Sequence, residues 1–184
     1  MTSTDFLKRL CEGYVRSYRT LNLRVDCSMA DATHKEINFF GHLGEMLGFV
    51  ACLEWGRRDL SWLDPETDNV VLYMERESTD AKADAVMKKL FHTERSKAPR
   101  YLVGVLGWLK EDHYAKVKQA IFDRLKGRSL LLLAWVGPDI GHATKLEVIV
   151  ACDGSICTRQ ATAEQDKDKY WYVRFDGGWR NAVG

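Results

Sequence analysis

The sequence predicts an α/β fold in which helices cover both faces of a central mixed sheet. Two continuous apolar runs, at residues 101–108 and 129–136, have the length of strands that are buried on both faces. Helical periodicity occupies the segments around them, at about 81–91 and 111–126, and a strand-like run lies earlier at 70–75. A β-α-β-α-β order of this kind predicts neighbouring parallel strands joined by right-handed crossovers.

Two helices are predicted before the sheet. The first covers residues 3–20, where aromatic and aliphatic side chains recur at helical spacing. The second runs from about Thr33 to Leu47, and Gly48 suits the position just after its C-terminus. The segment 21–32 mixes strand-like and turn-like residues and receives no assignment.

A β-hairpin is predicted directly after the second helix. Residues 49–55 and 57–63 have the composition of strands. The turn-forming cluster at 64–69, which contains Pro, Asp and Asn, separates 57–63 from the strand at 70–75. Because such clusters mark tight reversals, a hairpin is the simplest interpretation.

The C-terminal part of the chain has a different character. Residues 145–151 and 170–175 are strand-like, and the polar stretch 158–169 is predicted to connect them. These strands either extend the sheet or form a small β appendage, and the sequence leaves both possibilities open.

Length and charge indicate one domain without a strong electrostatic field. A chain of 184 residues fits a single domain. We expect a core at 33–136, a helical N-terminal extension at 1–32 and a β-rich C-terminal extension at 137–184. The net charge of +1 argues against a protein that coats nucleic acid or an anionic membrane through its overall charge.

The cysteines and the N-terminus indicate a soluble, cytoplasmic protein with no membrane partner. The five cysteines are odd in number and include no C-x-x-C pair, so a disulfide framework is not expected. The first ten residues, MTSTDFLKRL, carry charges where a signal peptide needs an apolar run. No uncharged apolar stretch reaches the roughly 20 residues that a membrane span needs.

The predicted hairpin gathers acidic residues. Strand side chains alternate between faces, so Glu75 and Glu77 point the same way. Residues opposite each other in a hairpin share a constant index sum, and for Asp59 and Glu75 this sum, 134, centres the turn on residue 67. Because residue 67 lies inside the turn cluster 64–69, we expect Asp59 close to opposite Glu75.

Such a group of carboxylates has a chemical consequence. Three carboxylates near one point repel one another unless a cation joins them. Carboxylate oxygens are hard ligands that suit Mg²⁺ or Mn²⁺. A Mg²⁺ ion bound in this way retains several water ligands and leaves a coordination position for a phosphate oxygen. A cation held in this way polarises a phosphodiester and lowers the pKa of an attacking water. The composition therefore favours phosphodiester hydrolysis over thiol or serine chemistry.

The stretch from His34 to about Val136 resembles the PD-(D/E)XK, or restriction endonuclease-like, nuclease superfamily in the order of its elements. Arg58-Asp59-Leu60 resembles the Asp-bearing strand of that family. Glu75-Arg76-Glu77 resembles its (D/E)-x-K, with Glu in place of the usual Lys, as in some restriction enzymes. The resemblance implies a three-layer α/β/α core and a Mg²⁺-dependent nuclease. Its expected partner is nucleic acid, with DNA the first choice and RNA left open, and a homodimer is one possible assembly.

The resemblance also implies roles for particular residues. Lys89 on the following helix would supply the missing positive charge, with Lys82 as a weaker candidate. Glu36, which shares the inward face of the second helix with its apolar residues, would complete the shell, with Glu45 as second choice. The implied catalytic residues are Glu36, Asp59, Glu75, Glu77 and Lys89, and the implied metal ligands are Asp59, Glu75 and Glu77.

Other interpretations stay open. The chain could be an inactive relative of the fold that binds nucleic acid or a protein partner, or a structural module whose carboxylates form a solvated hairpin edge. The aromatic cluster at 170–172 would stack bases or sugars, or pack against a sheet face. A dispersed basic set would track phosphates or form ordinary helix surface. This set comprises Arg95, Lys97, Arg100, Lys116, Lys118, Arg124, Lys126 and Arg128.

Overall fold

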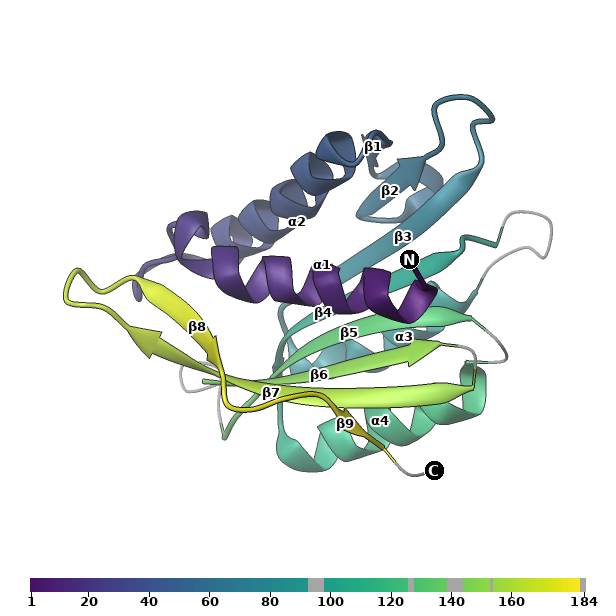
Figure 1. The fold of residues 1–184 in the computed structure, drawn as a ribbon. Helices are drawn as coiled ribbons and strands as arrows, with labels where there is room; N and C mark the ends of the chain where they lie inside the picture. The colour runs from purple at the N-terminus through teal and green to yellow at the C-terminus, as the bar shows by residue number, and fades with distance from the viewer. Residues whose placement is uncertain (93–97, 126–127, 139–143, 153, 183–184) are drawn as a thin grey trace.

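The computed structural model of the chain describes residues 1–92, 98–125, 128–138, 144–152 and 154–182 (Figure 1). Within these ranges it contains one mixed sheet of nine strands together with four α-helices. The strands are β1 (Val50–Leu53), β2 (Leu60–Leu63), β3 (Val70–Glu77), β4 (Tyr101–Leu109), β5 (Ser129–Val136), β6 (Lys145–Cys152), β7 (Ser155–Gln165), β8 (Trp171–Phe175) and β9 (Arg180–Asn181). The helices are α1 (Ser3–Ser17), α2 (Met29–Met46), α3 (Ala83–Phe91) and α4 (Glu111–Arg124), with short 3-10 helices η1 (Tyr18–Leu21), η2 (Trp55–Arg57) and η3 (Asp80–Lys82).

The strands β1, β2 and β3 form an antiparallel meander, as the turn residues predicted. Leu60 lies opposite Met74 and Trp62 lies opposite Leu72. Both pairs have the index sum of 134, so the predicted register is confirmed. The strand predicted at 57–63 is shorter, because Glu54 and Arg57 adopt left-handed backbone conformations with φ of 54° and 63°. The chain therefore turns through η2 before β2 begins.

The middle of the sheet is parallel, and the C-terminal strands continue it. β3 pairs in parallel with β4, and β4 with β5, which confirms the predicted crossovers through α3 and α4. β6, β7 and β8 then add on antiparallel, so the C-terminal region extends the same sheet.

The prediction of a polar connection at 158–169 was wrong for most of that range, because residues up to Gln165 belong to β7. The inward positions of β7 hold small residues such as Ala161 and Ala163, while polar residues occupy the outward positions. A strand with one solvated face alternates in this way, and its small inward residues weaken the apolar signal.

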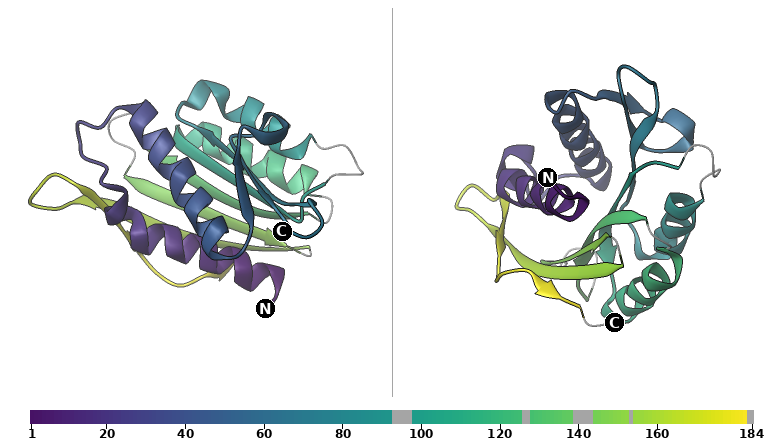
Figure 2. Two further views of the ribbon diagram at one scale, coloured as in Figure 1. Left: turned by 90° about the horizontal axis from the view of Figure 1, so that it is seen from above. Right: turned by 45° about the vertical axis from the view of Figure 1, so that its right-hand side comes forward.

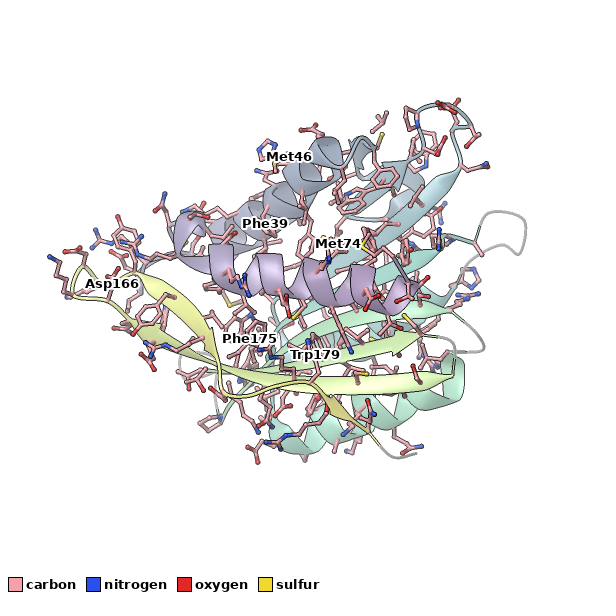
Figure 3. All side chains as sticks on the ribbon, viewed as in Figure 1. Phe39, Met46, Met74, Asp166, Phe175 and Trp179 are labelled. Atoms are coloured by element: carbon pink, nitrogen blue, oxygen red, sulfur yellow. The ribbon has the colours of Figure 1, made fainter. Side chains whose placement is uncertain are left out.

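Helices lie on both faces of the sheet (Figure 2). α1 and α2 cover one face, and the core beneath them includes Met74 of β3 (Figure 3). α3 and α4 cover the opposite face, with Tyr73 of β3 in their core. α1 contacts β5, β6 and β8, while α2 contacts β1, β2 and β3. Neighbouring residues of β3 therefore face different helical layers.

The two predicted N-terminal helices are present, and the second begins earlier than expected. The Ser28 hydroxyl accepts a hydrogen bond from the Asp31 N–H, which caps α2 at residue 28. Gly48 follows the helix with φ of 89°, the left-handed geometry expected after a helix C-terminus. No helix in the described ranges has the length and apolar character needed to cross a membrane.

Candidate active site

Asp59 and Glu75 approach each other across the β2–β3 pair. Glu75 belongs to β3 and faces the α3 layer, since its neighbour Tyr73, two positions earlier, lies in that core. Asp59 directly precedes β2, and its Oδ2 accepts a 2.7 Å hydrogen bond from the backbone N–H of Arg76. The hairpin thus carries one carboxylate from each of two adjacent segments to the same face.

Lys89 of α3 joins this pair. Its Nζ lies 2.5 Å from Oε2 of Glu75 and 3.9 Å from Oδ1 of Asp59. The Glu75 side chain is only 2% exposed, whereas those of Asp59 and Lys89 are 30% and 39% exposed. The cluster of Asp59, Glu75 and Lys89 therefore has a buried base and a solvent-accessible outer side.

The second oxygen of Glu75 is poorly compensated. Its Oε1 is buried and has no hydrogen-bond partner in the described part of the chain, although Arg58 Nη1 lies 3.6 Å away. Burial raises the pKa of Glu75 to about 7, and the nearby Asp59 charge also raises it, while Lys89 and Arg58 oppose the shift. An uncompensated buried carboxylate oxygen is costly and suits a site that binds a cation or holds a proton.

Arg58 contributes to the site in a way that the sequence motif did not indicate. Its Nη2 donates a 2.6 Å hydrogen bond to the carbonyl oxygen of His92, at the C-terminus of α3. Arg128 Nη1 donates to the neighbouring carbonyl oxygen of Phe91 at 2.8 Å. Cations are favourable at a helix C-terminus, so the two arginines fix the end of α3 and with it the position of Lys89.

A basic cavity shares Lys89 with the carboxylate cluster. It has a volume of about 810 Å³. Its other charged or titratable walls are Lys88, His92, Arg124 and Arg128. Arg124 and Arg128 belong to the predicted basic set. Arg100, Lys116 and Lys118 do not line this cavity, and Arg95, Lys97 and Lys126 lie outside the described residues.

Glu77 and Glu36 take other positions. Glu77 turns its Oε1 to the Ser78 N–H at 2.8 Å and to the Thr79 hydroxyl at 3.4 Å. Glu36 is buried as expected for the inward face of α2, but on the opposite side of the sheet from Glu75. There its Oε2 pairs with Arg76 Nε at 2.8 Å. The structure therefore does not bring Glu36 into the cluster of Asp59, Glu75 and Lys89.

The two second-choice residues also lie elsewhere. Glu45 is exposed near the end of α2, where a carboxylate oxygen lies 3.3 Å from Nδ1 of His42. Lys82 is exposed at the residue that precedes α3. Of the two lysines considered from the sequence, Lys89 is the one that meets the carboxylates.

The donor set at the cluster is small. Among the described residues, no group of three or more His, Cys, Asp or Glu side chains is arranged to hold a metal ion. Asp59 and Glu75 provide two carboxylates, one of which has the unpartnered Oε1. Mg²⁺ commonly takes one or two protein carboxylates and completes its shell with water and phosphate oxygens, so the chemistry of this pair fits such an ion.

The aromatic residues at 170–172 separate into three environments. The Tyr170 ring lies beneath the guanidinium group of Arg19, at 4.1 Å from the ring centroid. Trp171 lines a second cavity on the α1–α2 side of the sheet. Tyr172 donates its hydroxyl hydrogen bond to Glu164 at the surface. The cluster therefore does not form one continuous stacking surface.

Searches against protein-family models, curated proteins and solved structures find no match to this chain. The functional argument consequently rests on the residues and their geometry.

Proposed function

We propose that the protein is a divalent-metal-dependent nuclease that hydrolyses phosphodiester bonds at the cluster of Asp59, Glu75 and Lys89. The observation that carries the proposal is the convergence of these three side chains, from three separate segments, on one accessible point. A buried carboxylate, a half-exposed carboxylate and a lysine amine at that point match the chemistry needed for a metal and a phosphate group.

The residues divide the work by their surroundings. Asp59 and the unpartnered Oε1 of Glu75 would hold the cation, which supplies Lewis acidity and a more acidic water. The Arg76 N–H keeps the Asp59 carboxylate oriented toward the cluster. Lys89 places a positive charge next to the expected position of a phosphate oxygen. This charge would stabilise the negative charge that develops in the transition state.

The adjoining cavity favours a polyanionic substrate. Its cationic walls are Lys88, Lys89, Arg124 and Arg128, of which Lys89 contacts the carboxylates, although the whole chain has a net charge of only +1. A local basic surface of this kind binds the phosphates of a nucleic acid strand without a large overall charge. We propose that a DNA strand follows this cavity past Asp59.

The order of elements supports a restriction endonuclease-like core. α2, the β1–β3 meander, α3, β4, α4 and β5 follow one another in the order that the resemblance implies. The carboxylates lie on the meander and the lysine lies on the helix that follows it, as in variants whose lysine has moved from the strand. We propose this relationship for the stretch that ends at β5.

Metal binding and cleavage provide the test. Full-length wild type would be titrated calorimetrically with Mn²⁺ and Mg²⁺ and incubated with labelled single-stranded, duplex and branched DNA. We expect Asp59→Asn to weaken metal binding and to slow cleavage on the order of a hundredfold or more, since several kcal/mol of charge stabilisation are lost.

Glu45→Gln is the matched control, because it removes an exposed carboxylate on α2 that pairs with His42. It should leave both binding and cleavage unchanged. Equal cleavage by wild type and Asp59→Asn would reject the proposal, as would the absence of metal binding by wild type.

A second candidate is a nucleic-acid-binding protein without catalysis. The observation that favours it is the cationic surroundings of Glu75, whose two oxygens lie 2.5 Å from Lys89 and 3.6 Å from Arg58. In that case the basic cavity alone would bind DNA, binding would be insensitive to chelators, and Asp59→Asn would retain full affinity. Metal binding measured by calorimetry separates the two candidates.

A further inference from the structure

A second cavity lies on the opposite face of the sheet from Asp59 and Glu75. Its volume is about 540 Å³, within the range of about 300–1,000 Å³ that small-molecule sites occupy. It lies among η1, the start of α2, the ends of β4 and β5, and the β7–β8 pair. It shares no lining residue with the basic cavity.

Aromatic side chains form much of its wall. Trp108, Trp135, Trp171 and Tyr18 line it, and the rings of Tyr18 and Trp135 lie 5.3 Å apart between centroids. The β4–β5 register shifts between Leu106 and Leu109, and the cavity receives Trp108 from this irregular segment. Indole and phenol side chains in a cavity wall favour a flat ring as occupant.

A buried arginine forms the polar part of the lining. The Arg76 side chain is only 6% exposed, its Nε binds Glu36 at 2.8 Å, and its Nη1 binds the Ser78 hydroxyl. Among the described residues, its Nη2 has no hydrogen-bond acceptor. A Cβ at Gly107 would lie 2.9 Å from this Nη2, so the absence of a side chain at Gly107 leaves the room that the guanidinium occupies.

The charge of Arg76 is already balanced. Glu36 is 1% exposed and accepts a second hydrogen bond from the Tyr14 hydroxyl at 2.5 Å, so it stays fixed against the arginine. Burial and the Glu36 charge raise the pKa of Tyr14 and of Tyr18 well above the usual value, which keeps both phenols neutral. The other arginine of the lining, Arg24, lies 3.2 Å from a carboxylate oxygen of Asp26. With both arginines paired, the lining offers a strong hydrogen-bond donor without an unbalanced positive charge.

We infer that this cavity binds an uncharged planar heterocycle that carries a ring carbonyl oxygen. The ring would stack among the indoles, and the carbonyl oxygen would accept a hydrogen bond from the unpartnered N–H of Arg76 Nη2. A full anion would bring an unbalanced charge next to Glu36, which disfavours it. The inference is independent of the proposed nuclease function, because none of its residues contributes a side chain to the cluster of Asp59, Glu75 and Lys89.

Three related probes test the chemical class. Carbostyril (quinolin-2(1H)-one) has the flat ring and the carbonyl, quinoline lacks the carbonyl, and quinaldate carries a carboxylate instead. In full-length protein labelled with 5-fluorotryptophan, fluorine NMR would follow each titration, because the chain contains six tryptophans. We expect carbostyril to bind about tenfold more tightly than quinoline, the effect of one hydrogen bond to a charged donor.

The fluorine signals identify the binding site without any mutation. Those of Trp108, Trp135 and Trp171 should shift with carbostyril, while those of Trp55 and Trp62, which lie outside the cavity, should stay fixed. Equal affinities for carbostyril and quinoline, tighter binding of quinaldate, or shifts confined to Trp55 and Trp62 would each overturn the inference.

Two variants complete the test. Glu36→Gln combined with Arg76→Met removes the ion pair without leaving one charge alone, and it should abolish the preference for carbostyril over quinoline. Trp171→Ala, at the half-buried edge of the cavity, should weaken both probes. Asp59→Asn should bind carbostyril as wild type does, so a failure of the nuclease proposal leaves this result interpretable.

Discussion

Replacement of Glu75 by glutamine removes an ionisable group from a position where its charged form is poorly solvated. The side chain is 2% exposed, and burial raises its pKa from the ordinary 4.5 to about 7. The folded protein therefore holds this proton more tightly than the unfolded chain does. Consequently the free energy of unfolding falls as the pH rises from about 4.5 to about 7, and the loss is complete above that range.

The size of this effect follows from the two pKa values. The difference between 4.5 and about 7 corresponds to about 3 kcal/mol, at about 1.4 kcal/mol for each tenfold change in proton affinity. Lys89 is 39% exposed, so water reaches the outer side of the cluster and screens part of the interaction. We expect roughly half of the full value, about 1–2 kcal/mol, to be lost between about pH 5 and pH 7.5.

Urea unfolding in the presence of a chelator measures this loss directly. The unfolding free energy of wild type should decline with pH more steeply than that of Glu75→Gln, by about 1–2 kcal/mol across the range. Glu45→Gln, which removes an exposed carboxylate, should follow the wild-type curve. Parallel curves for wild type and Glu75→Gln would refute the assignment of a raised pKa to Glu75.

Three further substitutions concern the helices at the site and around it. Gly44→Ala should lower the unfolding free energy by about 2 kcal/mol or more, because the new Cβ would lie 2.5 Å from the buried Trp62 Nε1. In the same helix, the new Cβ of Gly41→Ala would lie 3.9 Å from Leu60 Cδ1, so this variant should be neutral or gain up to about 1 kcal/mol in urea unfolding. Lys89→Met removes the hydrogen bond that lowers the pKa of Glu75, so that pKa should rise above about 7. Carbon NMR of the labelled carboxyl group would show the rise, and an unchanged midpoint would contradict the contact.

The hairpin and its carboxylate pair were predictable because local chemistry determines them. The turn residues at 64–69 fix where the chain reverses, and side-chain alternation then fixes which residues of β2 and β3 oppose each other. These relations need only short-range pattern and strand geometry. The expectation for Lys89 came instead from the family resemblance, and the structure places Lys89 on α3 with its Nζ 2.5 Å from Glu75.

The location of Glu36 required information that periodicity does not contain. Its position on the inward stripe of α2 correctly predicts burial, and the side chain is 1% exposed. A helix that packs on a two-sided sheet faces only one of the two sides, and the helical pattern does not say which. The buried partner on that side is Arg76, one residue away from Glu75.

Arg58 was missed for a related reason. Its importance comes from the end of α3, where it binds the carbonyl oxygen of His92, 34 residues later in the chain. Only the tertiary structure brings those two atoms together. The one local sign is the arginine itself, which directly precedes a buried strand. Its side chain is 8% exposed, which is unusual for a charged residue.

Strand β3 serves as a shared wall, with Glu75 presented to one helical layer and Arg76 to the other. Inserting or deleting a single residue just before Glu75 would exchange the two faces. A deletion would bring the arginine to the position of Glu75 in the carboxylate cluster, and an insertion would bring the glutamate to the position of Arg76 in the second cavity. This segment can therefore tolerate substitutions but not a change of length. A single insertion or deletion there would disrupt both the carboxylate cluster and the second cavity.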